Sequence, residues 1–389
     1  MRKQYNVVVV GAGPAGSTAA RYAAASGASV LLLEKDRDIG IPVRCAEGIS
    51  RKGLLASVNE IDRRWIANET KGVTFHAPNG NQVELDTETG YILDRKIFDF
   101  DLAQLAASEG ASILTKAYVH DVIKKDSQAV GVKVNHLDEN YDVYADIVIG
   151  ADGVESRVGT WAGLNTRCKL SDMETCVQVT ANNVDVNTDH IHLYFSNNRA
   201  PRGYLWAFPK KDGLANVGLG ISGEMAKEKS PVDYLHDFLA ADFPNASQLT
   251  TVAGGVPCDK TLDQIVGDGL MLVGDAAHQA NPITGGGISS GMYAGMLAGQ
   301  VAGKAIKDKN VSSKRLAEYN QLWHKKEGRN HKICYNLKNY VYTLSDQELD
   351  GIAEKALKSD KEKRTLLMLF RMALVKKPSL IMQALKVFS

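Results

Sequence analysis

Residues 5–16, YNVVVVGAGPAG, decide the fold of this chain. The β-branched run at 5–10 ends at a glycine and predicts a buried strand. The alanine-rich residues 17–25 predict a helix, and residues 29–33 predict a second strand. The chain therefore opens with a β-α-β unit.

The glycines of this stretch have the spacing Gly11-x-Gly13-x-x-Gly16. Between a strand and a helix, that spacing indicates a dinucleotide-binding loop. Gly11 permits the tight turn, Gly13 leaves room for a pyrophosphate, and Gly16 lets the helix pack close to the strand. Together with Ala15, they place the pyrophosphate at the positive end of the helix dipole.

Glu34 ends the second predicted strand, 18 residues after Gly16. A carboxylate there accepts hydrogen bonds from the adenosine ribose and repels a 2′-phosphate, so NADP is a poor occupant. The alternative is a solvated charge at a strand end. We favour ribose binding because the glycine loop precedes this residue.

Two later motifs favour FAD over NAD. The sequence GADG at 150–153 follows one predicted strand, and GDAA at 274–277 follows another. Asp275 is placed to bind a ribityl hydroxyl. The glycines at 285–287 open a predicted helix, 285–305, whose first amides face the flavin ring. An ordinary helix N-cap is the alternative for Asp275.

Composition bounds the class of protein. The 389 residues allow two domains, and 44% apolar with 23% charged residues is ordinary for a globular protein. A net charge of +1 predicts no nucleic-acid partner. Five scattered cysteines have no metal-ligand spacing, so we expect no metal and a reduced, cytoplasmic location. The longest apolar runs are too short to predict a membrane-spanning helix.

Alternating residues after about 166 predict an antiparallel sheet. Strands are expected at 175–181, 191–195, 204–208 and 215–221, with a helix at 231–239. We therefore expect an α/β fold. Its Rossmann-type FAD-binding domain, 1–165 and 262–325, holds an inserted antiparallel substrate domain, 166–261. Residues near 75–95 are further candidates for the substrate domain, and 326–389 form a C-terminal helical region.

The tail at 364–388 is both apolar and basic, and Pro378 predicts a break between two helices. Such a pair can lie on a membrane surface or can cover the protein's own core. We favour the core, since most amphipathic helices serve that purpose. Upstream of this tail, Ser345 and Glu348 predict a capping box.

The motifs GAGPAG, GADG and GDAA resemble those of the flavoprotein monooxygenase superfamily. One departure is that Ser156 is followed at once by Arg157, where aromatic hydroxylases have Ser-x-x-Arg. A closer resemblance is to the geranylgeranyl reductase family, which includes the digeranylgeranylglycerophospholipid reductases of archaeal lipid synthesis. The segments that carry it are PVRCAEG at 42–48, GYILDR at 90–95, YLWAFP at 204–209 and residues 274–288.

The resemblance implies FAD contacts spread over the predicted cofactor domain, at Gly16, Glu34, Cys45, Ala46, Gly48, Arg95, Val119, Asp275, Gly287 and Ile288. It also implies that Tyr204, Trp206 and Phe208, which alternate along one strand and share a face, line the substrate cavity. From the pattern alone, a sheet core explains that strand equally well. Cys45 is either a thiol close to the flavin, with Arg44 lowering its pKa, or a small buried loop residue.

The function implied is that of an FAD-dependent oxidoreductase acting on CH-CH groups, which hydrogenates double bonds of geranylgeranyl chains in archaeal-type lipids. Its partners would be a polyprenyl lipid, a peripheral membrane surface and an electron donor, which is NADPH, ferredoxin or another reduced carrier. No residue stands out as the proton donor. The rival functions are an FAD-dependent monooxygenase, a quinone or electron-transfer oxidoreductase, and a non-catalytic flavin-binding protein.

Overall fold

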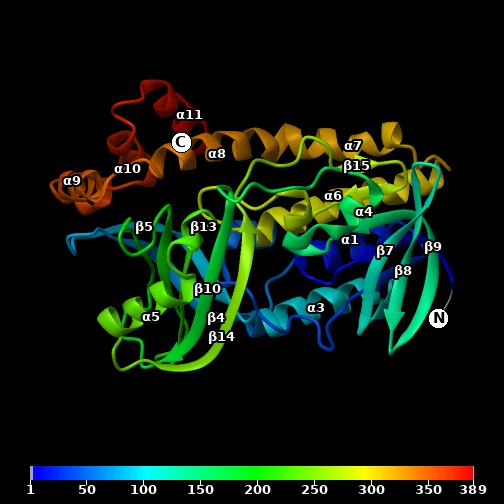
Figure 1. The fold of residues 1–389 in the computed structure, drawn as a ribbon, viewed down its shortest axis with the longest axis horizontal. Coiled ribbons are helices and arrows are strands. Elements are labelled where there is room, and N and C mark those ends of the chain that lie inside the picture. Colours follow the sequence, from blue (N-terminus) through cyan, green and yellow to red (C-terminus); the bar gives the residue numbers. More distant parts are fainter. Residues whose placement is uncertain (1–2, 389) are drawn as a thin grey trace.

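The computed structural model describes residues 3–388, and within them the strands form two eight-stranded sheets surrounded by helices (Figure 1). One sheet has a parallel centre, and the other is almost entirely antiparallel. The last helices lie beside the antiparallel sheet. The expected α/β class, with a Rossmann-type sheet, an antiparallel sheet and a C-terminal helical region, is confirmed.

The centre of the first sheet has the parallel order β16-β9-β1-β2-β6. β7 and β8 extend it along the first half of β9 as antiparallel strands, and β15 pairs with β16. The strands are β1 (Gln4–Val10), β2 (Val30–Leu33), β6 (Ser112–Leu114), β7 (Ala117–Lys125), β8 (Gln128–His136), β9 (Glu139–Gly150), β15 (Val266–Gly267) and β16 (Leu270–Leu272).

Helices α1 (Pro14–Ala25) and α6 (Ile288–Lys307) pack side by side against this sheet, with α3 (Arg95–Ser108), α4 (Arg157–Ala162) and α7 (Ser313–Trp323) around them. Glycines on α6 allow the close approach, because a Cβ at Gly299 would lie 2.5 Å from the Ala19 carbonyl oxygen. α6 begins three residues later than expected. Gly285 has a φ of +66°, so the glycine-rich segment is still a loop there.

The second sheet has the order β14-β10-β13-β12-β11-β4-β5-β3, and only β4 and β11 pair in parallel. Helix α5 (Pro231–Asp242) packs on one face of this sheet, and α2 (Arg51–Leu55) follows its edge strand. The strands are β3 (Gly48–Ser50), β4 (Ile66–His76), β5 (Gln82–Leu93), β10 (Met173–Asn182), β11 (His190–Tyr194), β12 (Gly203–Pro209), β13 (Ala215–Ser222) and β14 (Ser247–Pro257).

This sheet takes more of the N-terminal half than the residues near 75–95 that we expected, since β3 and the start of β4 also belong to it. β3 is only three residues long, and the start of β4 has polar residues on both faces, so neither shows a clean alternation in the sequence. The exact domain boundaries stay a prediction.

The C-terminal helices are α8 (Arg329–Val341), α9 (Asp346–Leu357), α10 (Leu366–Ala373) and α11 (Pro378–Phe388). The Ser345–Glu348 capping box and the break before Pro378 are both confirmed. α10 and α11 pack on α8 through an apolar cluster that includes Leu337, Phe370 and Ala384. The tail therefore does cover the protein's own core. Within residues 3–388, no helix is both long enough and apolar enough to cross a membrane.

Candidate active site

One continuous cavity of about 980 Å³ joins the two sheets. It runs from the glycine loop at 13–16, across the inner face of the antiparallel sheet, to the C-terminal helices. That volume is at the upper end of small-molecule sites, which hold roughly 300–1,000 Å³. Ten of the expected cofactor residues line it: Gly13, Ala15, Gly16, Cys45, Ala46, Gly48, Arg95, Asp275, Gly287 and Ile288.

The glycine loop has the geometry that its sequence predicts. Gly11 has a φ of +101°, and a Cβ there would collide with the Ala151 carbonyl oxygen. A Cβ at Gly16 would collide with the carbonyl oxygen of Gly11, so this residue must be small for α1 to meet β1. A Cβ at Gly13, in contrast, would have nothing within 4 Å. The open space beside Gly13 fits a pyrophosphate at the start of α1.

Glu34 stands at the end of β2 and accepts hydrogen bonds from the backbone amides of Ala12 (2.8 Å) and Asp36 (3.0 Å). Its carboxylate therefore also fixes the glycine loop. Gly11, Glu34 and Val119 do not line the large cavity. Val119 is a buried residue of β7. Their contact with a cofactor stays a prediction.

The GADG and GDAA motifs meet in space, because the Ser156 hydroxyl donates to the Ala276 carbonyl oxygen at 2.7 Å. Asp275 lines the cavity, and no group in residues 3–388 donates a hydrogen bond to its carboxylate. Burial raises the pKa of Asp275 to about 6, and the nearby Arg95 partly offsets this rise. A partly buried carboxylate without a donor gains from a ligand that satisfies it, so the position of Asp275 fits a cofactor hydroxyl.

The loop at 45–48 is held between both sheets by Glu47. The Glu47 carboxylate accepts from the Arg95 amide (2.9 Å) and from the Asn216 side chain (2.6 Å), and it pairs with Lys210. Gln178 adds a second anchor, since its amide donates to the Cys45 carbonyl oxygen at 2.9 Å. Sequence reasoning missed these anchoring residues, which lie far apart in the chain.

Cys45 lines the cavity as a free thiol. Burial raises its pKa, and the cation that partly opposes this effect is Arg95. Arg44, which the sequence suggested for that role, is exposed. The Arg95 guanidinium is itself paired with Asp99 through contacts of 2.6 and 2.7 Å. The geometry therefore describes a protonated thiol beside the cofactor space rather than an activated thiolate.

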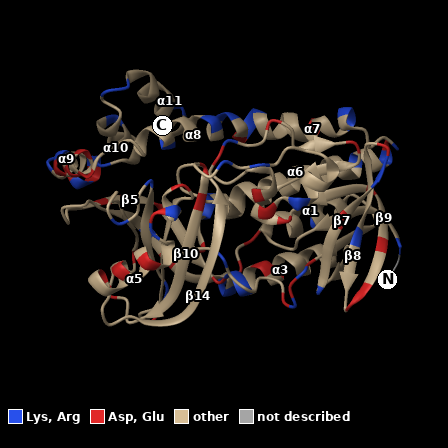
Figure 2. Ribbon diagram, viewed as in Figure 1, with Lys and Arg blue, Asp and Glu red and all other residues tan. Residues whose placement is uncertain are grey.

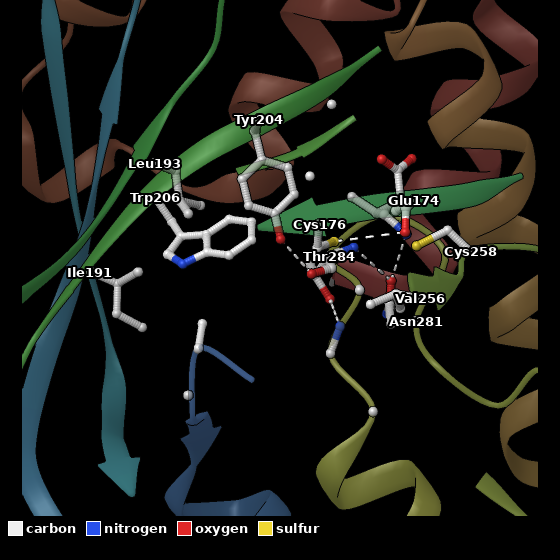
Figure 3. A pocket seen from close by; sticks show the side chains of 18 of the residues that line it. Glu174, Cys176, Ile191, Leu193, Tyr204, Trp206, Val256, Cys258, Asn281 and Thr284 are labelled. Carbon is white, nitrogen blue, oxygen red and sulfur yellow. Dashed lines mark hydrogen bonds between the residues drawn. The ribbon is translucent and has the colours of Figure 1, made fainter. Parts of the chain in front are cut away.

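Tyr204, Trp206 and Phe208 all line the cavity, while their neighbours Leu205 and Ala207 face the core under α5. The indole of Trp206 donates to Gln178 at 3.0 Å, and the Tyr204 hydroxyl donates to the Thr284 carbonyl oxygen at 2.5 Å. Figure 3 shows Trp206 beside Ile191 and Leu193, with Tyr204 between this group and Glu174. The strand therefore forms one wall of the cavity.

Glycines on the adjacent strand β13 make room for that wall. A Cβ at Gly218 would lie 2.7 Å from the Trp206 ring, and one at Gly220 would lie 3.0 Å from the Cys176 sulfur. Gly48 serves Phe208 in the same way, since a Cβ there would lie 2.7 Å from the ring. Sequence reasoning missed Gly218 and Gly220, although their spacing of two places both on one face of a strand.

The part of the cavity beside α8 and the segment 281–284 carries polar groups that the sequence did not indicate. Glu174, the second residue of β10, accepts a hydrogen bond from the Tyr342 hydroxyl at 2.5 Å. Lys338 forms an ion pair with Asp172 at 2.9 Å, and the two side chains are 1% and 4% exposed. These groups come from two regions more than 160 residues apart.

Cys168, Asp259 and His278 offer ligand atoms within 4.8 Å of one another, although their spacing predicts no metal. His278 Nδ1 is buried and has no hydrogen-bond partner in the described residues. A closed zinc site takes four protein ligands, so these three do not assign a metal.

Two family models match parts of the chain. The model described as the geranylgeranyl reductase catalytic domain matches residues 172–256, and an NAD(P)-binding Rossmann-like domain matches 9–53. The first region holds the aromatic strand and both glycines of β13, and the second holds the glycine loop and Glu34.

Curated relatives match over nearly the whole length. The chain is 44% identical over 360 residues to digeranylgeranylglycerophospholipid reductase 1 of Methanococcoides burtonii, covering 91% of this chain and 88% of that protein. It is 45% identical over 384 residues to digeranylgeranylglycerophospholipid reductase of Methanosarcina mazei, covering 97% and 94%.

Solved structures agree with this grouping. A geranylgeranyl bacteriochlorophyll reductase-like protein from Thermoplasma acidophilum has a TM-score of 0.92 and 37% identity, covering 99% of this chain and all of that one. A flavin-dependent brominase shares the fold at a TM-score of 0.72 and 18% identity, covering 97% and 99%. The identity of 44–45% to the curated reductases over nearly the whole chain, and the match to the Thermoplasma acidophilum structure, show that the chain belongs to the geranylgeranyl reductase family.

Proposed function

We propose that the protein is an FAD-dependent reductase that hydrogenates carbon–carbon double bonds of geranylgeranyl chains, in lipids of the digeranylgeranylglycerophospholipid type. The continuity of the cavity carries this proposal. The space beside Gly13, the unpaired carboxylate of Asp275 and the aromatic wall of β12 all border the same cavity. A cofactor bound along the loops would thus meet a substrate bound along the sheet.

The residues that fit FAD lie in three places. The pyrophosphate fits the glycine loop at the start of α1, the ribityl chain fits Asp275, and the flavin ring fits the segment 285–288 beside the 45–48 loop. We assign Glu34 to the adenosine ribose and Val119 to the adenine. When bound and reduced, FAD supplies a hydride with its two electrons. NADPH, ferredoxin or another reduced carrier provides those electrons.

The substrate part of the cavity suits a polyprenyl chain. Its walls are the aromatic residues of β12, the aliphatic Ile191 and Leu193 of β11, and Leu369 and Phe370 of α10. Such walls bind a hydrocarbon without requiring hydrogen bonds from it. The tasks of these side chains are to align one alkene with the cofactor and to exclude water.

We also propose that the tail rests on an anionic membrane surface while it covers the core. Figure 2 shows both charge signs interspersed over the two sheets. After Glu362, in contrast, the sequence has six lysines and arginines and no acidic residue. Leu366, Val375 and Met382 are 39%, 66% and 60% exposed there. Basic and apolar side chains together bind anionic lipid surfaces. Since α10 also lines the cavity, a lipid tail could enter beside it.

Anaerobic incubation with a geranylgeranyl phospholipid tests the reaction. The protein is first loaded with FAD and reduced with dithionite, and the lipid is then analysed by mass spectrometry. We expect a gain of two hydrogen atoms per reduced double bond, and none with the Gly13→Val variant. Unchanged lipid in this incubation, together with hydroxylation in a parallel incubation in air, would identify a monooxygenase instead. If the lipid is unchanged under all conditions, the result favours a non-catalytic flavin-binding protein.

A further inference from the structure

Glu174 lies at the end of the cavity wall formed by β10, close to Cys176 and Cys258 (Figure 3). Its side chain is well buried, at 7% exposure for the residue. One carboxyl oxygen, Oε1, accepts the hydrogen bond from Tyr342. The other, Oε2, is buried and has no hydrogen-bond partner in residues 3–388. The carboxyl group is therefore anchored on one side and unpaired on the other.

The unpaired oxygen points to the space that Gly220 leaves open. A Cβ at Gly220 would lie 3.8 Å from Oε2, 3.0 Å from the Cys176 sulfur and 3.8 Å from the Trp206 ring. Oε2 is thus close to the aromatic wall that we assign to the substrate. A hydrogen on Oε2 would have no acceptor among residues 3–388, and the residue that carries it borders the cavity.

The surroundings favour the protonated form of Glu174. Burial raises the pKa of Glu174 to about 7, and Tyr342 and Lys338 limit the rise. Lys338 is the nearest cation, but its ammonium group is already shared by Asp172 and the Cys258 carbonyl oxygen. The titratable and charged groups around Glu174 on all neighbouring elements are Cys168, Asp172, Cys176, Tyr204, Cys258, Lys338 and Tyr342.

We infer that Glu174 is the catalytic acid that protonates the alkene carbon not attacked by hydride. This inference rests on the proposed function. The O–H bond of the carboxylic acid breaks, its electron pair stays on the carboxylate, and the π electrons of the alkene form the new C–H bond. The other carbon takes the hydride that the reduced cofactor supplies. Glu174 then regains a proton from water before the next double bond is reduced.

The thiols and the phenol that line the cavity are weaker acids than Glu174, and Asp275, with a pKa of about 6, is assigned to a cofactor hydroxyl. Burial raises the pKa values of Cys45, Cys176 and Tyr204, so these groups hold their protons more tightly than they do in water. An acid works best when its pKa lies near the working pH, which Glu174 satisfies. An unactivated alkene is a poor base, so a carboxylic acid is favoured over these thiols and this phenol.

The rate test compares Glu174→Gln with Glu60→Gln, an exposed carboxylate that does not line the cavity. Glutamine keeps the shape and can still accept from Tyr342, so flavin content and lipid affinity should be unchanged. The single-turnover rate of alkene reduction should fall by roughly 10²–10⁴-fold for Glu174→Gln and by less than about twofold for Glu60→Gln. A Glu174→Gln rate within about threefold of the wild type would overturn the inference.

Infrared titration gives a readout that does not need turnover. The oxidised protein should show a carboxylic acid C=O band that disappears with a midpoint near pH 7 and is absent from Glu174→Gln. Tyr342→Phe removes a hydrogen bond that lowers this pKa, so the midpoint and the alkaline limit of activity should both move upward. A band that stays unchanged in Glu174→Gln contradicts the assignment. If wild-type protein reduces no lipid at all, the proposed function fails; if both variants reduce it equally, only Glu174 fails.

Discussion

Replacing Trp206 by alanine separates the two explanations of the aromatic strand. The residue is 7% exposed, so burial alone does not distinguish a core position from a cavity wall. Its ring lies over Gly218 and 5.8 Å from the Tyr204 ring, measured between centroids. The opposite neighbour on the same strand, Leu205, is fully buried under α5. Leu205→Ala is therefore the matched control for loss of core packing.

The stability cost follows from the contacts of the indole. Losing the hydrogen bond to Gln178 costs about 1 kcal/mol, and losing the aromatic pair with Tyr204 costs about 0.5–1.5 kcal/mol. Because the ring borders an existing cavity, truncation widens that cavity rather than sealing a new one. We expect a total of about 1.5–2.5 kcal/mol for Trp206→Ala, below the roughly 3–5 kcal/mol of a core aromatic. Leu205→Ala should cost roughly 2–5 kcal/mol.

The two variants should differ most in catalysis. Trp206→Ala should keep its flavin but reduce a geranylgeranyl lipid about tenfold to a hundredfold more slowly, since misplacing the reacting group by about 1 Å costs that much. Leu205→Ala, measured below its melting temperature, should reduce it at the normal rate. Thermal unfolding, flavin absorbance and single-turnover reduction are measured on the same samples. A Trp206→Ala protein that melts far lower yet reduces lipid normally would refute the cavity assignment.

Three further predictions concern the cofactor, pH and the membrane. Gly13→Val should abolish FAD binding by filling the open space beside the loop, and Glu34→Ala should weaken it; full occupancy in Gly13→Val, read from flavin absorbance, would contradict the assignment. The pKa of Glu174 rises from 4.5 to about 7 on folding, so protonation of Glu174 stabilises the fold fully below pH 4.5. The free energy of unfolding should fall by about 3 kcal/mol as the pH rises through 7. Denaturant unfolding of Glu174→Gln should lack this slope, and an unchanged slope would exclude Glu174 as its source. The double variant Val375→Asp and Met382→Asp should bind phosphatidylglycerol vesicles more weakly, while its melting temperature changes by no more than a few degrees. The control Leu249→Asp, at an exposed position of β14, should bind the vesicles as well as the wild type. If the double variant also binds as well as the wild type, the tail does not contact the membrane.

The sequence predicted the cofactor half well, because its determinants are local. Gly11, Gly13 and Gly16 act within one turn, so their spacing alone specifies the loop that the structure contains. Alternation also placed β10 to β13 within two residues of their observed ends. The extent of the second sheet was harder. β14 is exposed over most of its length, so it offers no apolar period to detect.

The polar end of the cavity could not be predicted for a different physical reason. Glu174, Tyr342 and Lys338 have ordinary neighbours in the sequence, and their chemistry arises only when β10 packs against α8 and excludes water. The pKa of a carboxyl group is set by desolvation and by charges in three dimensions, neither of which a spacing encodes. The same holds for Gln178, which links the Cys45 loop to Trp206 across two elements. Sequence motifs specify the backbone shape of a loop and so predict where a cofactor binds. The groups that would donate the proton come together only through tertiary packing, which the motifs do not encode.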